Sequence, residues 1–334
     1  KGKDMKEKYI PPFDITNKML ELVSTIMENL GKISTLTNLD KFPRLRKVGR
    51  LKSIHSSLAI ENNTLSLEQV TEVINGKRVL APEEDIIAVK NAYKTYDLIN
   101  IIDPYNVKDL LKAHKLMMQD LVEENGQFRT NNVGVFDNAG HVIHMAPPPN
   151  MVKELVENLF DFIKNSDVHM LIKSSVFHYE FEFIHPFRDG NGRMGRLWQT
   201  ALLAAWKPIF KWIPIETIIK DNQEDYYRAI AKSTQEAKSN EFIIFMLEVI
   251  EKATHIFSTD AQNHIERINI QVEKLMEVID YYPQSAKEIM KKLNLTSRNN
   301  FRNNYLVPAL KQGLIKQTHP DNPTSKNQRY YKAD

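Results

Sequence analysis

The residue types best suited to chemistry lie in one short segment, His185 to Arg196, with the sequence His-Pro-Phe-Arg-Asp-Gly-Asn-Gly-Arg-Met-Gly-Arg. Gly190 and Gly192 let the backbone approach an anion closely, and the N–H groups around them can form an anion-binding nest. Arg193 and Arg196 are three residues apart, so both project from one side of a helix that begins here. Because the N-terminus of a helix favours negative charge, the segment predicts a binding site for phosphate groups.

Two further side chains of the segment could act on a bound phosphate. Asp189 supplies one hard oxygen ligand, which is enough for a Mg²⁺ ion that keeps some waters and borrows phosphate oxygens. His185, with an ordinary pKa of about 6.5, suits proton abstraction at neutral pH. Together these groups predict transfer of a phosphate-bearing group. The Gly-Lys-Ser/Thr ending of a Walker A loop is missing, so the segment is not of that class.

The segment resembles the Fic family motif, His-x-Phe-x-Asp/Glu-Gly-Asn-Gly-Arg-x-x-Arg, at all eight specified positions. The resemblance extends over the helical segments on both sides, roughly residues 42–250. It implies an all-α core with a β-hairpin flap. It also implies transfer of AMP from ATP to a protein hydroxyl, with diphosphate leaving.

Residue by residue, the resemblance implies a role for each part of the loop. His185 would deprotonate a Ser, Thr or Tyr hydroxyl, which then attacks the α-phosphorus, and Asp189 would hold Mg²⁺ between the α- and β-phosphates. Phe187 would anchor the loop in the core. The residues implied to contact the phosphates of ATP are Gly190, Asn191, Gly192, Arg193 and Arg196, of which Asn191, Arg193 and Arg196 also count as catalytic.

Two further features bear on the nucleotide. Gly192 favours nucleotidyl transfer, because the phosphate-transferring Doc-type members carry lysine there. Tyr226 and Tyr227 resemble a tyrosine pair that lies near the adenine in the family. Another nucleotide, or phosphocholine from a CDP-choline, is the alternative donor that the sequence leaves open.

A second motif resembles the inhibitory Ser/Thr-x-x-x-Glu-Gly/Asn sequence of many Fic proteins, whose glutamate occupies the γ-phosphate site. Ser57 to Asn62 fits it, with Glu61 as the inhibitor, but Ser24 to Asn29 fits it equally well. The surroundings distinguish the two copies, because Arg50 and the Ser56-Ser57 pair resemble those of the family's inhibitory helix. We therefore expect Glu61 to inhibit and Glu28 to lie on the surface.

The segments that must position these residues are mostly helical in pattern. Apolar residues recur at helical spacing over 16–30, 85–99 and 107–121, and Ser66 with Gln69 predicts a capping box. A further apolar helix is expected at about 170–183, with His178 as a buried, hydrogen-bonded residue, and another leaves the loop at about Arg193. Residues 133–144 differ, because two short β-prone runs around Asp137-Asn-Ala-Gly140 predict a β-hairpin. The resemblance makes this hairpin, about 134–144, a flap that binds the extended backbone of a target protein.

The C-terminal part of the chain is basic. Between Pro283 and Asp334 ten Lys or Arg residues face three acidic ones, a net charge of +7, whereas the whole chain has +3. Two short helices, at 285–293 and 297–310, precede β-prone runs at 314–315 and 328–331. This order predicts a winged helix, whose second helix, with Arg298 and Arg302, would enter a DNA major groove. A protein contact or a merely solvated surface are the alternatives for 283–334.

The expected fold is thus mainly α, with a Fic helical core, a β-hairpin flap and a small winged-helix domain. We place an N-terminal helical region at 1–110, with the inhibitory helix near 50–62. The catalytic core follows at 111–255, a linker helix at 256–282 and the winged helix at 283–334. A DNA-binding regulator that uses the Fic core only to oligomerise is the non-enzymatic alternative, and a homodimer stays open.

Composition excludes several classes of protein. The chain has 334 residues, of which 42% are hydrophobic, so it can bury a core. It has no cysteine, which excludes disulfides, thiolate zinc sites and cysteine nucleophiles. No apolar run approaches the ~18 residues of a membrane span, and no signal peptide is visible. We expect a cytoplasmic protein without a membrane partner.

Overall fold

The computed structural model describes residues 9–36, 43–136 and 142–333. The chain divides into two compact units, Lys1–Phe257 and Ser258–Asp334. Most described residues are helical, as the sequence predicts, and the strands are short. None of the helices in the described ranges is long and apolar enough to cross a membrane.

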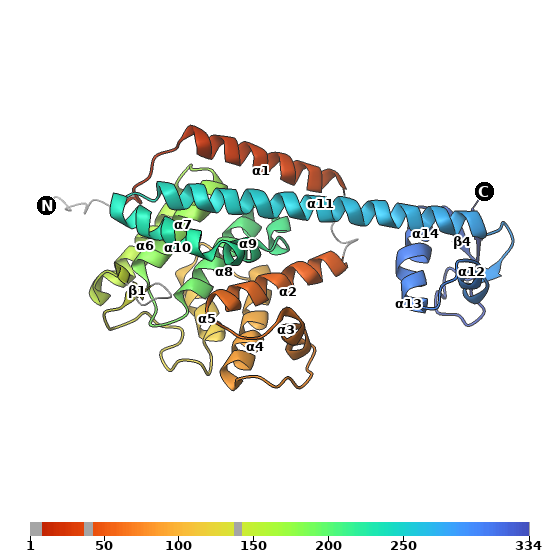
Figure 1. Ribbon diagram of the computed structural model, residues 1–334, viewed down its shortest axis with the longest axis horizontal. Helices are drawn as coiled ribbons and strands as arrows, with labels where there is room; N and C mark the ends of the chain where they lie inside the picture. Colours follow the sequence, from red (N-terminus) through yellow and green to blue (C-terminus); the bar gives the residue numbers. More distant parts are fainter. Residues whose placement is uncertain (1–8, 37–42, 137–141, 334) are drawn as a thin grey trace. The chain divides into compact units, whose positions relative to one another are not determined.

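The first unit is a bundle of helices with one hairpin (Figure 1). Its elements are α1 (Asn17–Leu36), α2 (Pro43–Ile60), α3 (Leu67–Ile74), α4 (Glu83–Asp97), η2 (Leu98–Asn100), α5 (Val107–Met117), β1 (Gly134–Phe136), β2 (Val142–Met145), α6 (Pro149–Asn165), α7 (Met170–Ile184), α8 (Asn191–Trp206), η3 (Pro208–Lys211), α9 (Ile215–Asp221), α10 (Gln223–Glu236) and the first part of α11 (Asn240–Val278). The capping box predicted for Ser66 and Gln69 is present at the start of α3.

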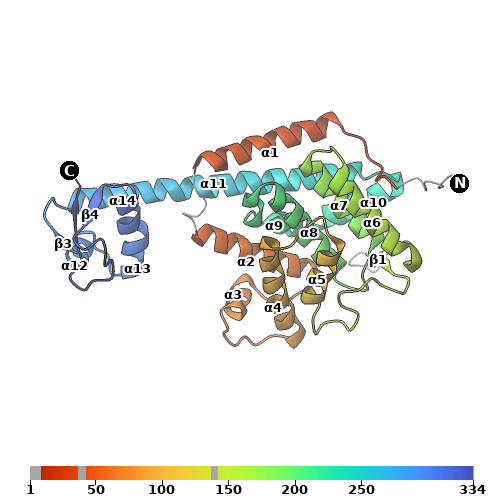
Figure 2. The same ribbon diagram turned by 180° about the vertical axis from the view of Figure 1, so that it is seen from behind.

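The core of this unit is built around α7 and α8, which pack closely against each other. Nearly every residue of α7 is buried, including the polar Ser174, His178 and Glu182 beside its apolar ones. Phe177, Phe187 and Trp198 are fully buried there. The helix α1 lies along the first part of α11 (Figures 1 and 2), and a buried hydrogen bond joins Asn29 Nδ2 to Thr254 Oγ1 at 3.3 Å. The loop between α7 and α8 is therefore supported on a rigid, closely packed pair of helices.

The predicted hairpin is confirmed in its two strands. β1 and β2 are antiparallel, with Gly134 opposite Met145 and Val135 opposite His144, and the register shifts between Val135 and Phe136. The predicted turn, residues 137–140, and the neighbouring His141 lie outside the described residues.

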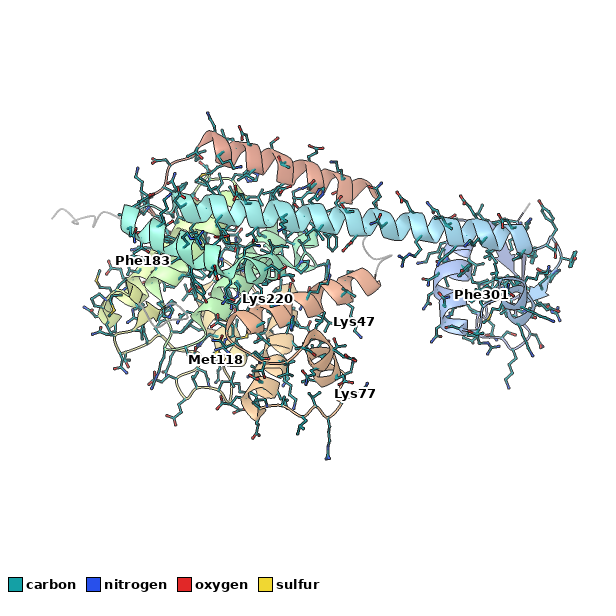
Figure 3. All side chains as sticks on the ribbon, in the orientation of Figure 1. Lys47, Lys77, Met118, Phe183, Lys220 and Phe301 are labelled. Atoms are coloured by element: carbon teal, nitrogen blue, oxygen red, sulfur yellow. The ribbon has the colours of Figure 1, made fainter. Side chains whose placement is uncertain are left out.

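The second unit contains the end of α11, followed by β3 (Gln284–Ser285), α12 (Ala286–Lys292), α13 (Arg298–Phe301), the π-helical turn η4 (Arg302–Leu306), α14 (Val307–Lys311), β4 (Ile315–Gln317) and β5 (Arg329–Lys332). The strands form an antiparallel sheet in the order β3-β5-β4. Phe301, labelled in Figure 3, is buried in its core, together with Leu275 of α11. The segment 256–282, expected as a linker, thus contributes side chains to this core.

The second helix of this unit is not the single α-helix that its sequence predicts. Pro308 has no N–H to donate to the carbonyl four residues earlier, and a wide turn precedes it. There the N–H of Val307 donates to the carbonyl of Arg302, five residues back. Three consecutive helical segments therefore replace the helix expected over 297–310.

Candidate active site

The loop after α7 is held in place by its own side chains. Asn191 closes it, because its Oδ1 accepts from the N–H of Phe187 at 2.9 Å and its Nδ2 donates to the carbonyl of Phe187 at 2.8 Å. Gly190 adopts a φ of +82°, and a Cβ there would collide with Met118 (labelled in Figure 3). The buried ring of Phe187 anchors the loop, as expected. The side chain of Asn191 thus stabilises the loop, and its N–H lies in the first turn of α8, where helix N–H groups lack intrahelical partners.

His114, on α5, fixes the other side of the loop, and sequence reasoning missed it. Its Nδ1 accepts from the N–H of Gly126 at 2.8 Å, so its Nε2 carries the proton and donates to the carbonyl of Asp189 at 3.0 Å. Its ring stacks on Phe187 with the centroids 3.6 Å apart. Burial lowers the pKa of His114 to about 4, which keeps the ring neutral at physiological pH.

His185 follows directly after α7 and lies partly exposed, with 18% of its side chain accessible. Its Nδ1 lies 3.3 Å from the main-chain carbonyl of Glu182, so Nδ1 donates and Nε2 is the nitrogen that can accept a proton. The Glu182 carboxylate lies 4.0 Å from the same Nδ1. Burial raises the pKa of Glu182 to about 8; Arg196 lowers it and Glu61 raises it further.

Asp189 and Arg193 pair beside the N-terminus of α8, and Asp189 is the more exposed of the two. Arg193 Nη2 lies 3.3 Å from Asp189 Oδ2, and the N–H of Gly190 donates to Asp189 Oδ1 at 2.6 Å. About half of the Asp189 side chain, 54%, is accessible, so its carboxylate can meet a ligand. Among the described residues no three His, Cys, Asp or Glu side chains gather to hold a metal ion.

The most buried charge of the site is the guanidinium of Arg196, which is bound from the side of α2. Its Nη2 donates to Glu61 Oε1 at 2.7 Å and to the carbonyl of Ser57 at 3.0 Å, and its Nε donates to Ser57 Oγ at 3.1 Å. Burial alone lowers the pKa of Arg196, but the surrounding negative groups, with the Glu61 carboxylate first among them, together hold that pKa above its ordinary value. A Cβ at Gly192 would overlap the Glu61 carboxylate, which therefore lies over the first turn of α8.

The competing copy of the short motif lies elsewhere. Glu28 is on α1 with 67% of its side chain accessible, and it pairs with Lys32 at 2.8 Å, one helical turn away. The structure thus places Glu61, and not Glu28, beside the loop between α7 and α8 that is predicted to bind phosphate.

The two adjacent tyrosines differ in exposure. Tyr226 is 2% exposed, and its hydroxyl lies 3.1 Å from Nε2 of His178, the buried histidine expected from the sequence. Tyr227 is half-buried, and its hydroxyl accepts from Gln223 Nε2 at 3.4 Å. Since Gln223 Nε2 also donates to the carbonyl of Ile60, Tyr227 lies near Glu61 at the edge of the site, whereas Tyr226 lies beneath it.

Two family models match the chain, the Fic/DOC family over residues 104–203 and the C-terminal domain of Fic-like proteins, named for filamentation induced by cAMP, over residues 270–331. A crystal structure of a Fic family protein from Desulfovibrio desulfuricans G20 is 45% identical, with a TM-score of 0.72, over 97% of this chain and 98% of that chain. The helical core, the hairpin and the loop are thus those of the Fic family, and the chain belongs to it.

More distant relatives carry a named activity. The protein adenylyltransferase Fic of Drosophila willistoni is 28% identical over 229 residues, which are 64% of this chain and 43% of that protein. The chain therefore spans less than half of the length of the curated relatives it matches. Fic-1 from C. elegans shares the fold with a TM-score of 0.61 at 17% identity, over 74% of this chain and 72% of that chain.

Proposed function

We propose that this protein is a protein adenylyltransferase, which transfers AMP from ATP to a Ser, Thr or Tyr hydroxyl of a target protein. One observation carries the proposal: a partly exposed histidine, an exposed carboxylate and two arginines surround the N-terminus of α8, where an anion binds best. Similarity to proteins named adenylyltransferases supports the same reaction.

The site suggests how each residue contributes. Nε2 of His185 takes the hydroxyl proton of the target, the hydroxyl oxygen bonds to the α-phosphorus, and the bond to the β-phosphate breaks so that diphosphate leaves. The N–H groups of the first turn of α8 bind the phosphates, and Arg193 and Arg196 balance their charge. Gly192 has no side chain to block this position.

Mg²⁺ fits the chemistry of this donor set. Asp189 offers a single exposed carboxylate beside the anion site, and Mg²⁺ commonly binds through one or two carboxylates together with substrate phosphates. When bound, the ion would neutralise charge that develops on the departing diphosphate.

We further propose that Glu61 inhibits the enzyme. Its carboxylate holds Arg196 and lies over the first turn of α8, so it competes with the γ-phosphate for both. ATP bound beside Glu61 would have its α-phosphorus turned away from the incoming hydroxyl. Serine hydroxyls on α2 support the inhibitory position. The hydroxyl of Ser53 donates to the carboxylate of Glu216, and the hydroxyl of Ser57 accepts from Arg196 Nε.

The hairpin is the proposed binding site for the target, through residues 134–144. A two-stranded hairpin leaves an edge strand with unpaired backbone groups, and an extended peptide can add to such an edge. Because this pairing uses main-chain groups, it leaves the identity of the target to other contacts.

The choice of donor is tested by offering the Glu61→Gly variant a panel of nucleotides that carry a radiolabel on the α-phosphate, together with CDP-choline labelled in its choline. We expect ATP to be the donor that labels protein most strongly. Stronger labelling by another nucleotide or by CDP-choline would leave the assignment of the site unchanged but show that the transferred group is not AMP. Tyr227, at the edge of the site, is the side chain we propose near the base.

The second unit is a candidate DNA-binding module. We propose that it is a winged helix, because its helices and the strand order β3-β5-β4 fit that arrangement. Arg298, Asn299, Arg302 and Asn303 are all exposed, and arginine and asparagine are the side chains that read guanine and adenine edges.

We also propose a cytoplasmic location, since a chain without cysteine fits a reducing compartment.

If this surface binds duplex DNA, the affinity should fall steeply with salt, because Lys and Arg release counterions. For about four phosphate contacts the expected loss between 50 and 200 mM salt is about 10²-fold. Fluorescence anisotropy of a labelled duplex with the full chain measures it. Arg298→Ala and Arg302→Ala should weaken binding further, whereas Lys153→Ala, an exposed change in the first unit, should not. Absence of binding at low salt would remove the DNA proposal and favour a protein contact.

A further inference from the structure

Arg129 is a buried arginine with no role yet assigned in the AMP transfer proposed for His185 and the loop. It lies between α5 and β1 with 3% of its surface exposed, and burial lowers its pKa. Its side chain donates to four main-chain carbonyls, those of Asn131 at 2.8 Å, Pro147 at 2.5 Å, Ile184 at 3.2 Å and His185 at 2.7 Å. A guanidinium presents five N–H donors in a rigid plane. One arginine can therefore donate to several acceptors spread over a wider area than the compact ammonium of a lysine can reach.

The first pair of contacts holds His185. The carbonyls at the end of a helix lack intrahelical partners, and Arg129 binds those of Ile184 and His185 at the end of α7. His185 has a φ of +48° and a ψ of +61°, a left-handed conformation that is uncommon for a residue with a side chain. The N–H of Arg129 also donates to the carbonyl of Pro186 at 3.0 Å. Three successive carbonyls around the proposed general base are thus fixed by one residue.

The second pair of contacts holds the base of the hairpin. Asn131 precedes β1 and Pro147 follows β2, so Arg129 binds both ends of the segment that carries the proposed target site. Nearby, the N–H of Ala146 donates to the carbonyl of Val133 at 3.2 Å and continues the pairing of the strands. The same guanidinium therefore joins the loop with His185 to both ends of the hairpin.

We propose that Arg129 is a positioning residue for AMP transfer, which fixes His185 relative to the hairpin so that a bound target presents its hydroxyl to Nε2. The inference rests on the proposed function and assigns to that reaction a residue outside the loop motif. A hydroxyl held by the hairpin reaches His185 only if the two parts keep a constant distance. A displacement of about 1 Å between reacting groups can cost about 10²-fold in rate.

The test compares Arg129→Lys and Arg129→Ala in the Glu61→Gly background, with Arg228→Lys as the control, because Arg228 is exposed and pairs with Asp225, three residues earlier on the same helix. The readout is the rate of self-modification by α-labelled Mg·ATP as a function of ATP concentration. For Arg129→Lys we expect a maximal rate reduced about 10²-fold, with half-saturating ATP changed less than about twofold. Added guanidinium chloride at millimolar concentration should partly restore Arg129→Ala but not change the parent variant.

Three results would overturn the proposal: an unchanged maximal rate in Arg129→Lys, a parallel loss of ATP binding, or failure of this conservative variant to fold. If the Glu61→Gly parent itself transfers no AMP, the proposed function fails, and the positioning is tested separately. The imidazole signals of His185 in the ¹⁵N NMR spectrum should then shift in Arg129→Lys and stay in place in Arg228→Lys. Unchanged His185 signals would contradict a positioning role whatever the reaction.

Discussion

Replacing Glu61 by glycine is expected to raise AMP transfer by about 10²-fold or more, most visibly as self-modification. Arg196 is buried, and its Nη2 donates to Glu61 Oε1 at 2.7 Å and to the carbonyl of Ser57. Removal of the carboxylate frees a guanidinium that can then bind the γ-phosphate, and it also removes a negative charge from the first turn of α8. Because Glu61 follows α2 and does not belong to the loop, the substitution leaves the groups that carry out the reaction unchanged.

Three related variants make this prediction specific. Glu61→Asp should activate to an intermediate extent, because its shorter side chain reaches Arg196 poorly. Arg196→Ala should not activate, since it removes the γ-phosphate ligand together with the inhibitor's partner. Glu28→Gly, the matched control in the second copy of the motif, should change nothing. Rates of labelling from α-labelled ATP measure all four variants. Activation by Glu28→Gly but not by Glu61→Gly would show that the inhibitor was assigned to the wrong glutamate.

Replacing His185 by alanine in the Glu61→Gly background is expected to reduce AMP transfer by about 10²–10⁴-fold, the usual contribution of a general base. The affinity for Mg·ATP should stay nearly unchanged. Nδ1 of His185 bonds to the carbonyl of Glu182, and the carbonyl of His185 accepts from Arg129, whereas the proposed phosphate contacts come from α8 and its arginines. Single-turnover labelling gives the rate, and isothermal titration with a non-hydrolysable ATP analogue gives the affinity.

The exposed His319, in the second unit, provides the control for this experiment. His319→Ala should retain both the rate and the affinity of the parent variant. If His185→Ala loses nucleotide binding together with transfer, the histidine supports the loop and another group must take the proton.

Much of the site could be predicted because its chemistry is concentrated in twelve consecutive residues, His185 to Arg196. Within such a segment, residue types and spacing already determine which groups can meet a phosphate. The capping box at Ser66 and the strands of the hairpin were predictable for the same reason, since each depends on neighbours a few residues away.

The residues that the sequence did not reveal act across long separations. His114 contacts the carbonyl of Asp189, 75 residues later, and Arg129 contacts that of His185, 56 residues later. In the sequence, His114 and Arg129 are polar residues in or beside an amphipathic segment, and no local pattern indicates which residue either of them contacts. The signal for Arg129 would have been a lone arginine just before a predicted hairpin, which is weak without the fold.

Two residues show how the fold refines a correct motif. Asn191 is expected from the resemblance to contact phosphate, but both polar groups of its side chain bind the backbone of Phe187, so its side chain maintains the loop. Tyr226 is expected near the adenine, but it is buried against His178. Two adjacent tyrosines on one helix cannot be ranked by burial from sequence alone, because tertiary packing sets the exposure of each.

We propose that this chain transfers AMP and that Glu61 restrains the transfer. Intact-mass spectrometry of the purified protein after incubation with Mg·ATP tests it most directly. We expect the Glu61→Gly variant to gain the mass of one or more AMP groups, the wild type to gain little, and the Glu61→Gly/His185→Ala variant to gain none. A mass increase of a phosphate group, or no increase in the Glu61→Gly variant while its ATP binding is intact, would contradict AMP transfer by this chain.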